Sequence, residues 1–237
     1  MTIFFGSVLS VTRMKLSPIQ KKQVEIDTKK KILGAVIDIS SLSPEEVLDI
    51  YNQKMKSVVV NLKGEIVKSS DGNDILAEKI NVSKNYKLNP EDRLYPVFMY
   101  SSSGEIIEYY IFPMFGNGLW DWISGFIALD KNLNKVIGVA FDHKAETPGL
   151  GARISSVEIQ ERYKGKEIFD KNENLISIKM LKGENNSIIS KHEVDGMSGA
   201  TITANGINKM MFHYFDCYKP FIDQKKKESL NLLAYNL

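Results

Sequence analysis

The segment Val194–Ile207, with the sequence VDGMSGATITANGI, places small and hydroxyl-bearing residues just before an expected helix. Its central tetrad is Ser198-Gly199-Ala200-Thr201. A helix N-terminus presents unpaired backbone N–H groups and the positive end of the helix dipole, so it favours an anion, and phosphate above all. Because Gly199 and Ala200 have almost no side chain, a bulky phosphorylated ligand could approach the backbone here. The segment indicates either a phosphate site or an ordinary capped turn.

Other common site chemistries find little support in the chain. No Gly-Lys-Ser/Thr triplet follows the tetrad, so it is not a Walker loop, and the dinucleotide fingerprint GxGxxG is absent. Cys217 is the only cysteine, and the three histidines, His143, His192 and His213, show no ligand spacing. We therefore expect neither an internal disulfide nor a metal site.

The composition is that of a globular protein with a real core. The chain has 237 residues, 43% of them hydrophobic and 25% charged, which is enough for one large domain. Its 31 basic and 29 acidic residues give a net charge of +2, and the short run Lys225–Lys227 is interpreted as a solvated helix end. We therefore expect no nucleic-acid partner.

The N-terminus, TIFFGSVLSVT, is apolar over about ten residues before Arg13 and Lys15. A bilayer span needs roughly 20 apolar residues, so this stretch is too short to cross. It indicates either a buried first helix or the stump of a membrane anchor. Ser17 and Pro18 then predict the N-cap and first residue of a charged surface helix.

The next elements alternate between helix and strand signals. Ser43 and Glu46 have the spacing of a capping box and predict a short helix to about Met55. A β-branched strand is expected over 58–62, and a polar excursion with little core over 68–93. Two hairpins are expected, one from 96–100 with 105–112 and one from 125–129 with 136–141. A short helix is expected at 155–163 and a strand at 175–181.

The last helix has the clearest pattern. An apolar stripe at helical spacing comprises Ile207, Met210, Met211, Tyr214, Phe215 and Tyr218. We expect this helix to begin after Thr203 as N-cap and to end before Pro220. Strands in hairpins with helices around them predict an α+β fold with twisted, largely antiparallel sheets.

The segment around Thr201 closely resembles the flavinylation segment of the C subunit of the sodium-translocating NADH:quinone oxidoreductase. In that family FMN is joined through its phosphate to the threonine of the tetrad, by a flavin transferase that takes FMN from FAD. The resemblance implies that Thr201 is the covalent attachment residue. Thr203, the expected helix cap in either case, would then also lie near enough to contact the phosphate. The transferase signal is matched by Asp195, Ser198, Gly199 and Ala200.

Three further stretches carry the same resemblance. They are Gly116–Trp120, His143–Gly151 and the N-terminal Leu16–Gln20 with Lys31–Val36, while the match thins between about 60 and 95. The N-terminal match and the chain length favour the C subunit over the related G subunit of the Rnf complex. The resemblance implies contacts with the flavin ring from Glu146, Thr147, Gly149, Leu150, Gly151 and Trp120.

The resemblance implies an electron-transfer flavoprotein subunit with covalent FMN, which belongs to an enzyme complex but is itself an electron carrier. Outer-sphere electron transfer requires no general acid, base or nucleophile in this chain. Expected partners are the other subunits of a membrane redox complex and the flavin transferase. The expected location is the bacterial inner membrane, with a single-pass anchor, truncated or altered here, and the flavin domain on the periplasmic side.

Alternative functions remain open on these grounds. They are a G subunit of an Rnf-type complex, a free-standing FMN-binding electron carrier, and a non-catalytic binding domain in which the tetrad is a structural turn. The expected organisation is a remnant anchor over 1–15, a helical and extended region over 16–95, an FMN-binding domain over 96–222, and a tail over 223–237.

Overall fold

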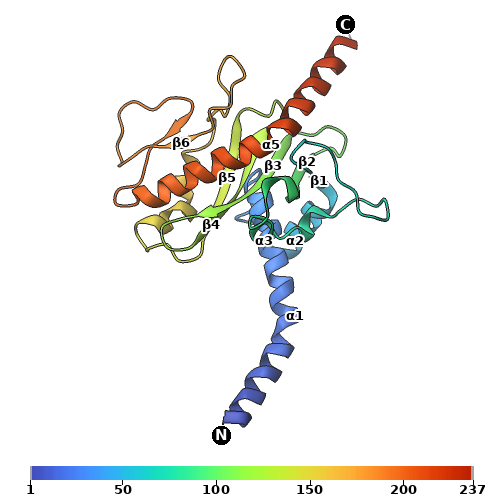
Figure 1. Cartoon of the computed structure of the whole chain (residues 1–237), viewed down its shortest axis with the longest axis vertical. Coiled ribbons are helices and arrows are strands. Elements are labelled where there is room, and N and C mark those ends of the chain that lie inside the picture. Colours follow the sequence, from blue (N-terminus) through green and yellow to red (C-terminus); the bar gives the residue numbers. More distant parts are fainter. Residues whose placement is uncertain (1, 236–237) are drawn as a thin grey trace.

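The computed structural model describes residues 2–235, which form an antiparallel sheet covered by helices (Figure 1). The strands follow chain order across the sheet and are β1 (Met55–Val60), β2 (Tyr95–Tyr100), β3 (Tyr109–Asn117), β4 (Trp122–Asp130) and β5 (Val136–His143). A second, parallel pair consists of β6 (Lys179–Met180) and β7 (Glu193–Val194). The α+β prediction and both predicted hairpins are confirmed. The expected strand over 175–181 is wrong in extent, because only two of its residues pair.

Both faces of the five-stranded sheet are buried. Alternate side chains of a strand point to opposite faces, so Val60 and Val97 belong to one apolar cluster, whereas Val59 and Phe98 belong to the other. The first cluster packs under α5 (Thr201–Tyr235), which lies across the sheet (Figure 1). The second is covered by the end of α1 (Thr2–Gly34) and by α2 (Pro44–Lys54). Helix α5 is thereby fixed to the sheet along its apolar stripe.

Helix α1 runs without a break from Thr2 to Gly34, and its N-terminal part projects away from the body (Figure 1). The predicted helix start at Ser17 and Pro18 is therefore wrong. Pro18 removes one hydrogen bond, to the carbonyl of residue 14, and the strong helix formers around it tolerate this loss. Ile32 and Leu33 near its end are fully buried, whereas the large apolar side chains from Phe4 to Val24 are exposed. No helix within residues 2–235 has both the length and the apolar character required for crossing a bilayer.

Helix α2 begins with the predicted capping box. The Glu46 amide donates to Ser43 Oγ at 3.3 Å, and the Ser43 amide donates to Glu46 Oε2 at 2.8 Å. Val47 is buried in the second cluster and Leu42 packs against the same cluster, which agrees with a hydrophobic staple. This helix start is thus specified by local sequence.

We expect Ser43→Ala to lower the free energy of unfolding by about 1 kcal/mol, because it leaves the Glu46 amide without its cap. Ser43→Asp is the matched control, since its carboxylate accepts the same bond, and it should retain most of the stability. Urea unfolding monitored by circular dichroism measures both. Equal losses in the two variants would contradict a capping role.

Helix α5 continues to Tyr235, so the predicted end before Pro220 is wrong. A proline within a helix costs about 3 kcal/mol. Tertiary packing offsets this cost, because Phe221 and Ile222 directly after it are fully buried. The turn at Gly64, where φ is +81°, lies so close that an added Cβ would be 2.5 Å from the Phe221 nitrogen. The helix is therefore held against the body directly after the proline.

The remaining short helices are η1 (Ala77–Lys79), α3 (Val82–Asn85), η2 (Pro90–Asp92), η3 (Gly151–Ser155) and α4 (Val157–Glu161). Within the polar excursion, Ala77 and Arg93 are nevertheless buried. The boundaries expected after residues 15, 95 and 222 fall inside α1, β2 and α5 respectively. Met1 and residues 236–237 of the expected anchor and tail lie outside the described residues.

Candidate functional site

Glu146 joins three segments at the start of α5. The residue is 4% exposed, and Oε1 of its carboxylate accepts hydrogen bonds from the backbone amides of Leu119 and Trp120 at 2.8 and 3.0 Å. Oε2 accepts a hydrogen bond from the Thr203 hydroxyl at 2.5 Å. The β3–β4 turn, the loop after β5 and the first turn of α5 therefore meet at one buried carboxylate. Three of the stretches that the sequence singled out are brought together here.

Two glycines make this close packing possible. A Cβ added at Gly118 would lie 2.4 Å from Glu146 Oε1, and one added at Gly151 would lie 2.4 Å from Oε2 and 2.6 Å from Thr203 Oγ1. All three distances are far below van der Waals contact, so a side chain at either position would displace the carboxylate. Gly151 thus belongs to the site through packing around Glu146.

Thr201 is the first residue of α5 and is partly exposed. A helical hydrogen bond runs from the Ala204 amide to the Ala200 carbonyl at 3.0 Å, so the amides of residues 201–203 precede it as donors of the helix N-terminus. Thr203 is buried within the first turn, so its assignment as N-cap is wrong. The helix begins at Thr201, three residues earlier than predicted, because the tetrad itself leads into it and Glu146 accepts the Thr203 hydroxyl.

The loop before Thr201 is shaped by Gly199, whose φ of +72° favours glycine. A Cβ there would lie 2.8 Å from Leu150 Cδ2, so the Leu150 side chain reaches the tetrad. Gly149 also has a positive φ, of +75°, which allows the loop after Glu146 to bend towards α5. The predicted ring-contact loop and the predicted attachment loop are therefore direct neighbours.

Exposed apolar side chains surround this junction. We call Leu119, Trp120, Leu150 and Ile202 the apolar rim; they are 45, 68, 41 and 58% exposed respectively. Trp120 lies at the surface rather than in the core, and its indole Nε1 donates to Thr147 Oγ1 at 3.2 Å. The rim presents apolar surface from all three segments beside Thr201.

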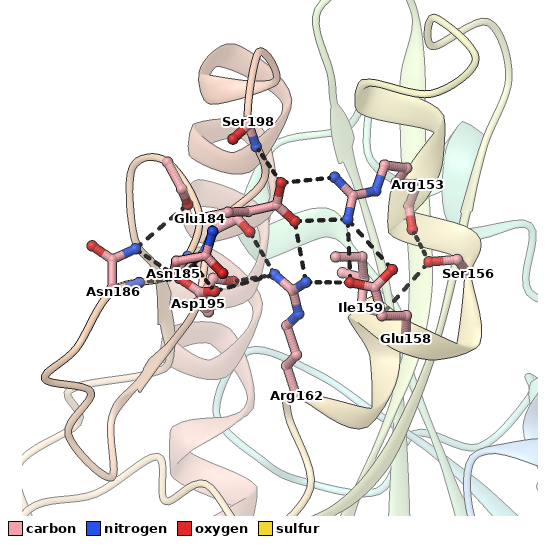
Figure 2. A network of polar contacts seen from close by, with 12 residues as sticks. Arg153, Ser156, Glu158, Ile159, Arg162, Glu184, Asn185, Asn186, Asp195 and Ser198 are labelled. Carbon is pink, nitrogen blue, oxygen red and sulfur yellow. Dashed lines mark hydrogen bonds and ion pairs between the residues drawn. The ribbon is translucent and has the colours of Figure 1, made fainter.

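The Asp195 side chain points towards the backbone of the neighbouring loop at Asn185 and Asn186 (Figure 2). Its carboxylate accepts hydrogen bonds from the amides of Asn185, Asn186 and Gly196, and from the Asn186 side chain at 2.7 Å. Although burial opposes the shift, these bonds, those from Asn186 foremost, hold the pKa of Asp195 below its usual value. Asp195 therefore folds the 184–186 loop against the segment that leads to Thr201.

A carboxylate that sequence reasoning missed lies at the centre of the same network (Figure 2). Glu184 is paired with Arg153 at 2.7 Å and with Arg162 at 3.2 Å, and it accepts the Ser198 amide at 3.2 Å. Arg153 lies two residues after the Gly149–Gly151 stretch, so its proximity to the site could have been predicted from the sequence. The sequence around Glu184 and Arg162 shows no motif that would predict a role at the site. The network forms only when distant loops fold together.

Acid should weaken this network. Hydrogen bonds from Arg153 first, and then from the Ser198 amide, lower the pKa of Glu184 from its usual 4.5 to about 2. A depressed pKa in the folded state means that the contribution of Glu184 to stability is complete above pH 4.5 and disappears as the pH falls towards 2. The stability difference between the wild type and Glu184→Gln should shrink over that range in urea unfolding at a series of pH values. A pH-independent difference would contradict the shift.

Comparison with known proteins agrees with this geometry. Residues 118–214 match the model of the FMN-binding domain, which covers the junction at Glu146 and Thr201. The fold and the site thus define an FMN-binding domain protein. The crystal structure of the C subunit of Na(+)-translocating NADH-quinone reductase from Parabacteroides distasonis superposes with a TM-score of 0.74 at 32% identity, over 87% of this chain and 96% of that one. The chain belongs to the family formed by the C subunits of that reductase.

Further relatives have the same name. The C subunit from Haemophilus ducreyi is 28% identical over 227 residues, which span 91% of this chain and 86% of the relative. The C subunit from Vibrio vulnificus is 36% identical over 135 residues, which span 54% of this chain and 51% of the relative. The NqrC structure of Shewanella oneidensis, at 23% identity and a TM-score of 0.73 over 86% of this chain and 98% of that one, supports the fold.

Proposed function

We propose that this chain carries FMN covalently on Thr201 and transfers electrons as the C subunit of a sodium-translocating NADH-quinone reductase. The observation that carries the proposal is the convergence on Glu146 of three motif segments beside Thr201. An ordinary capped turn would need none of this construction. A threonine at the rim of such a junction is accessible to a modifying enzyme.

The residues present fit a flavin phosphate at Thr201. An ester on this hydroxyl keeps a negative charge at the N-terminus of α5, where the helix dipole contributes about 0.3–1 kcal/mol for an exposed anion. That energy is too small to retain a cofactor, so a covalent bond would do so. Ser198 and Gly199 are exposed and Ala200 is small, which leaves the approach to the backbone open.

The attachment reaction would be a displacement at a phosphorus atom of FAD. The Thr201 oxygen attacks the phosphorus on the flavin side of the diphosphate, one O–P bond forms, and the diphosphate P–O bond breaks. AMP leaves, and the hydroxyl proton passes to solvent through the transferase. No oxidant or reductant is needed for this step.

The apolar rim, with Glu146, Thr147, Gly149 and Gly151 behind it, would hold the isoalloxazine ring near the surface. Bound FMN supplies the redox chemistry, and the protein sets its place, its polarity and its exposure. Leu150 and Trp120 offer apolar contacts to the ring, and Glu146 fixes the loops that bear them. An exposed ring edge would let a partner's redox centre approach.

The partners that we propose are the other subunits of the complex and the flavin transferase. The apolar residues of α1 before Arg13 would be part of a single-pass anchor in the bacterial inner membrane. The flavin domain would then lie on the periplasmic side. The chain's own role in NADH:quinone reduction would be that of an electron carrier.

Co-expression tests the attachment. We expect protein made together with a flavin transferase to gain the mass of FMN less water and to fluoresce in a denaturing gel. Protein made without the transferase should have the unmodified mass. Identical masses in the two preparations, with a known carrier protein labelled in parallel by the same transferase, would reject the proposal.

A further inference from the structure

Glu184 draws together segments that are distant in sequence but adjacent to the proposed attachment loop (Figure 2). Its Oε1 accepts from Arg153 Nη2 at 2.7 Å and from Arg162 Nη2 at 3.2 Å. Its Oε2 accepts from Arg153 Nη1 at 3.0 Å and from the Ser198 amide at 3.2 Å. A forked pair with Arg153 fixes both position and direction of the carboxylate. Glu184 therefore connects Ser198, three residues before Thr201, to Arg153 in η3 and to Arg162 at the end of α4.

Arg162 extends this tie to the motif backbone. Its Nη1 donates to the Gly196 carbonyl at 2.5 Å and to the Asp195 carbonyl at 3.3 Å, while its Nη2 meets Glu184. On the other side, a Cβ added at Gly196 would lie 1.9 Å from the Leu181 carbonyl oxygen. The segment from Asp195 to Ser198 is thus held between Arg162, Glu184 and the 181–183 backbone.

Glu158 binds the same two arginines but differs from Glu184 in its exposure and in its contacts. It pairs with Arg153 at 3.2 Å and with Arg162 at 2.5 Å, and its side chain is 60% exposed. Among the contacts described for residues 2–235 it has none to the segment 195–198, whereas Glu184 is only 18% exposed and holds the Ser198 amide. The two glutamates are therefore a matched pair for separating charge pairing from control of the loop.

We propose that Glu184 is a positioning residue for flavin transfer, which holds the Asp195–Ser198 backbone in the shape that a flavin transferase accepts. This inference rests on the proposed attachment at Thr201. The tetrad contains Gly199, whose backbone has many accessible conformations, and Ser198 and Gly199 are exposed. Fixing the loop in advance removes the cost of ordering it at the moment of binding. Glu184 acts through the Ser198 amide and Arg162, and it takes no part in bond formation.

The test compares carriers made without transferase and then labelled in vitro by purified transferase with FAD. For Glu184→Gln we expect the rate constant of FMN incorporation to fall roughly ten- to hundredfold, as for other small misplacements of a reacting group. Glu158→Gln should label at the wild-type rate. The loss should arise chiefly from a higher KM for the carrier. The final labelled fraction should equal that of the wild type, whereas partial unfolding would lower it.

A second variant covers poor folding of Glu184→Gln. Arg162→Lys retains the positive charge, but one ammonium group cannot serve Glu184 and the Gly196 carbonyl with the fork of a guanidinium, so labelling should again be slow. If either folded variant labels as fast as Glu158→Gln, the positioning role is overturned. If the wild type also gains no FMN, the attachment at Thr201 fails and the positioning role fails with it, a pattern that differs from a defect confined to the variants.

Discussion

Thr201→Ala is expected to abolish the covalent gain of FMN completely, because it removes the only oxygen that the proposed bond can use. The rest of the site should stay in place, since Glu146, Leu119, Trp120 and Thr203 keep their hydrogen bonds. Intact mass after co-expression with the transferase measures the effect. Retention of the full FMN mass in the alanine variant would place the bond elsewhere.

Two controls sharpen this result. Thr28→Ala removes an exposed hydroxyl on α1, which donates to the Val24 carbonyl, and should leave labelling unchanged. Thr201→Ser restores a hydroxyl at the same place and should regain the adduct at a reduced rate. A serine variant that behaves like alanine, while folded, would mean that Thr201 acts by shape rather than as the acceptor.

Glu146→Ala is expected to lower the free energy of unfolding by about 3 kcal/mol, a larger loss than that expected for Ser43→Ala. The change removes a buried acceptor and leaves the amides of Leu119 and Trp120 and the Thr203 hydroxyl without their partner. It also opens a cavity between Gly118 and Gly151, which pack directly on the carboxylate. Urea unfolding followed by Trp fluorescence and circular dichroism measures it.

Glu146→Gln and Glu161→Ala serve as comparisons. The glutamine has nearly the same volume, its carbonyl oxygen accepts the two amides, and its NH₂ donates towards Thr203, so it should cost less than alanine. Glu161 is exposed and pairs only with a lysine at i+3 among the described contacts, so its removal should stay within about 0.5 kcal/mol. A Glu146→Ala variant as stable as Glu161→Ala would show that the junction does not depend on the carboxylate.

Prediction from sequence succeeded where the signal was local. The capping box at Ser43 and Glu46 and both hairpins were recovered because turn chemistry and alternation act within a few residues. It failed at Pro18 and Pro220, where proline by itself predicts a helix boundary. At Pro220 the buried Phe221 and Ile222 outweigh the proline, and their burial depends on strands more than a hundred residues away.

Predictions about the candidate site also succeeded for local segments and failed for contacts between distant residues. The resemblance in the segment around Thr201 and in the stretch from His143 to Gly151 pointed to both loops, and the structure makes them neighbours. The roles of Thr203 and Glu184 were not accessible, because each depends on a partner at a distance. Thr203 was expected at the helix cap, yet its hydroxyl is bound by a glutamate 57 positions earlier in the chain.

The sequence by itself determined the α+β class and the amphipathic stripe of the last helix, and its resemblance to a known family indicated the residues at which we propose a flavin site. Periodicity and turn residues express themselves locally, so they could be read without a fold. Only the tertiary structure decided where α5 begins and ends, that Glu146 gathers three segments, and that Arg153, Arg162 and Glu184 hold the loop before Thr201. These features depend on hydrogen bonds and ion pairs between distant residues, and such pairs exist only after the sheet has brought them together.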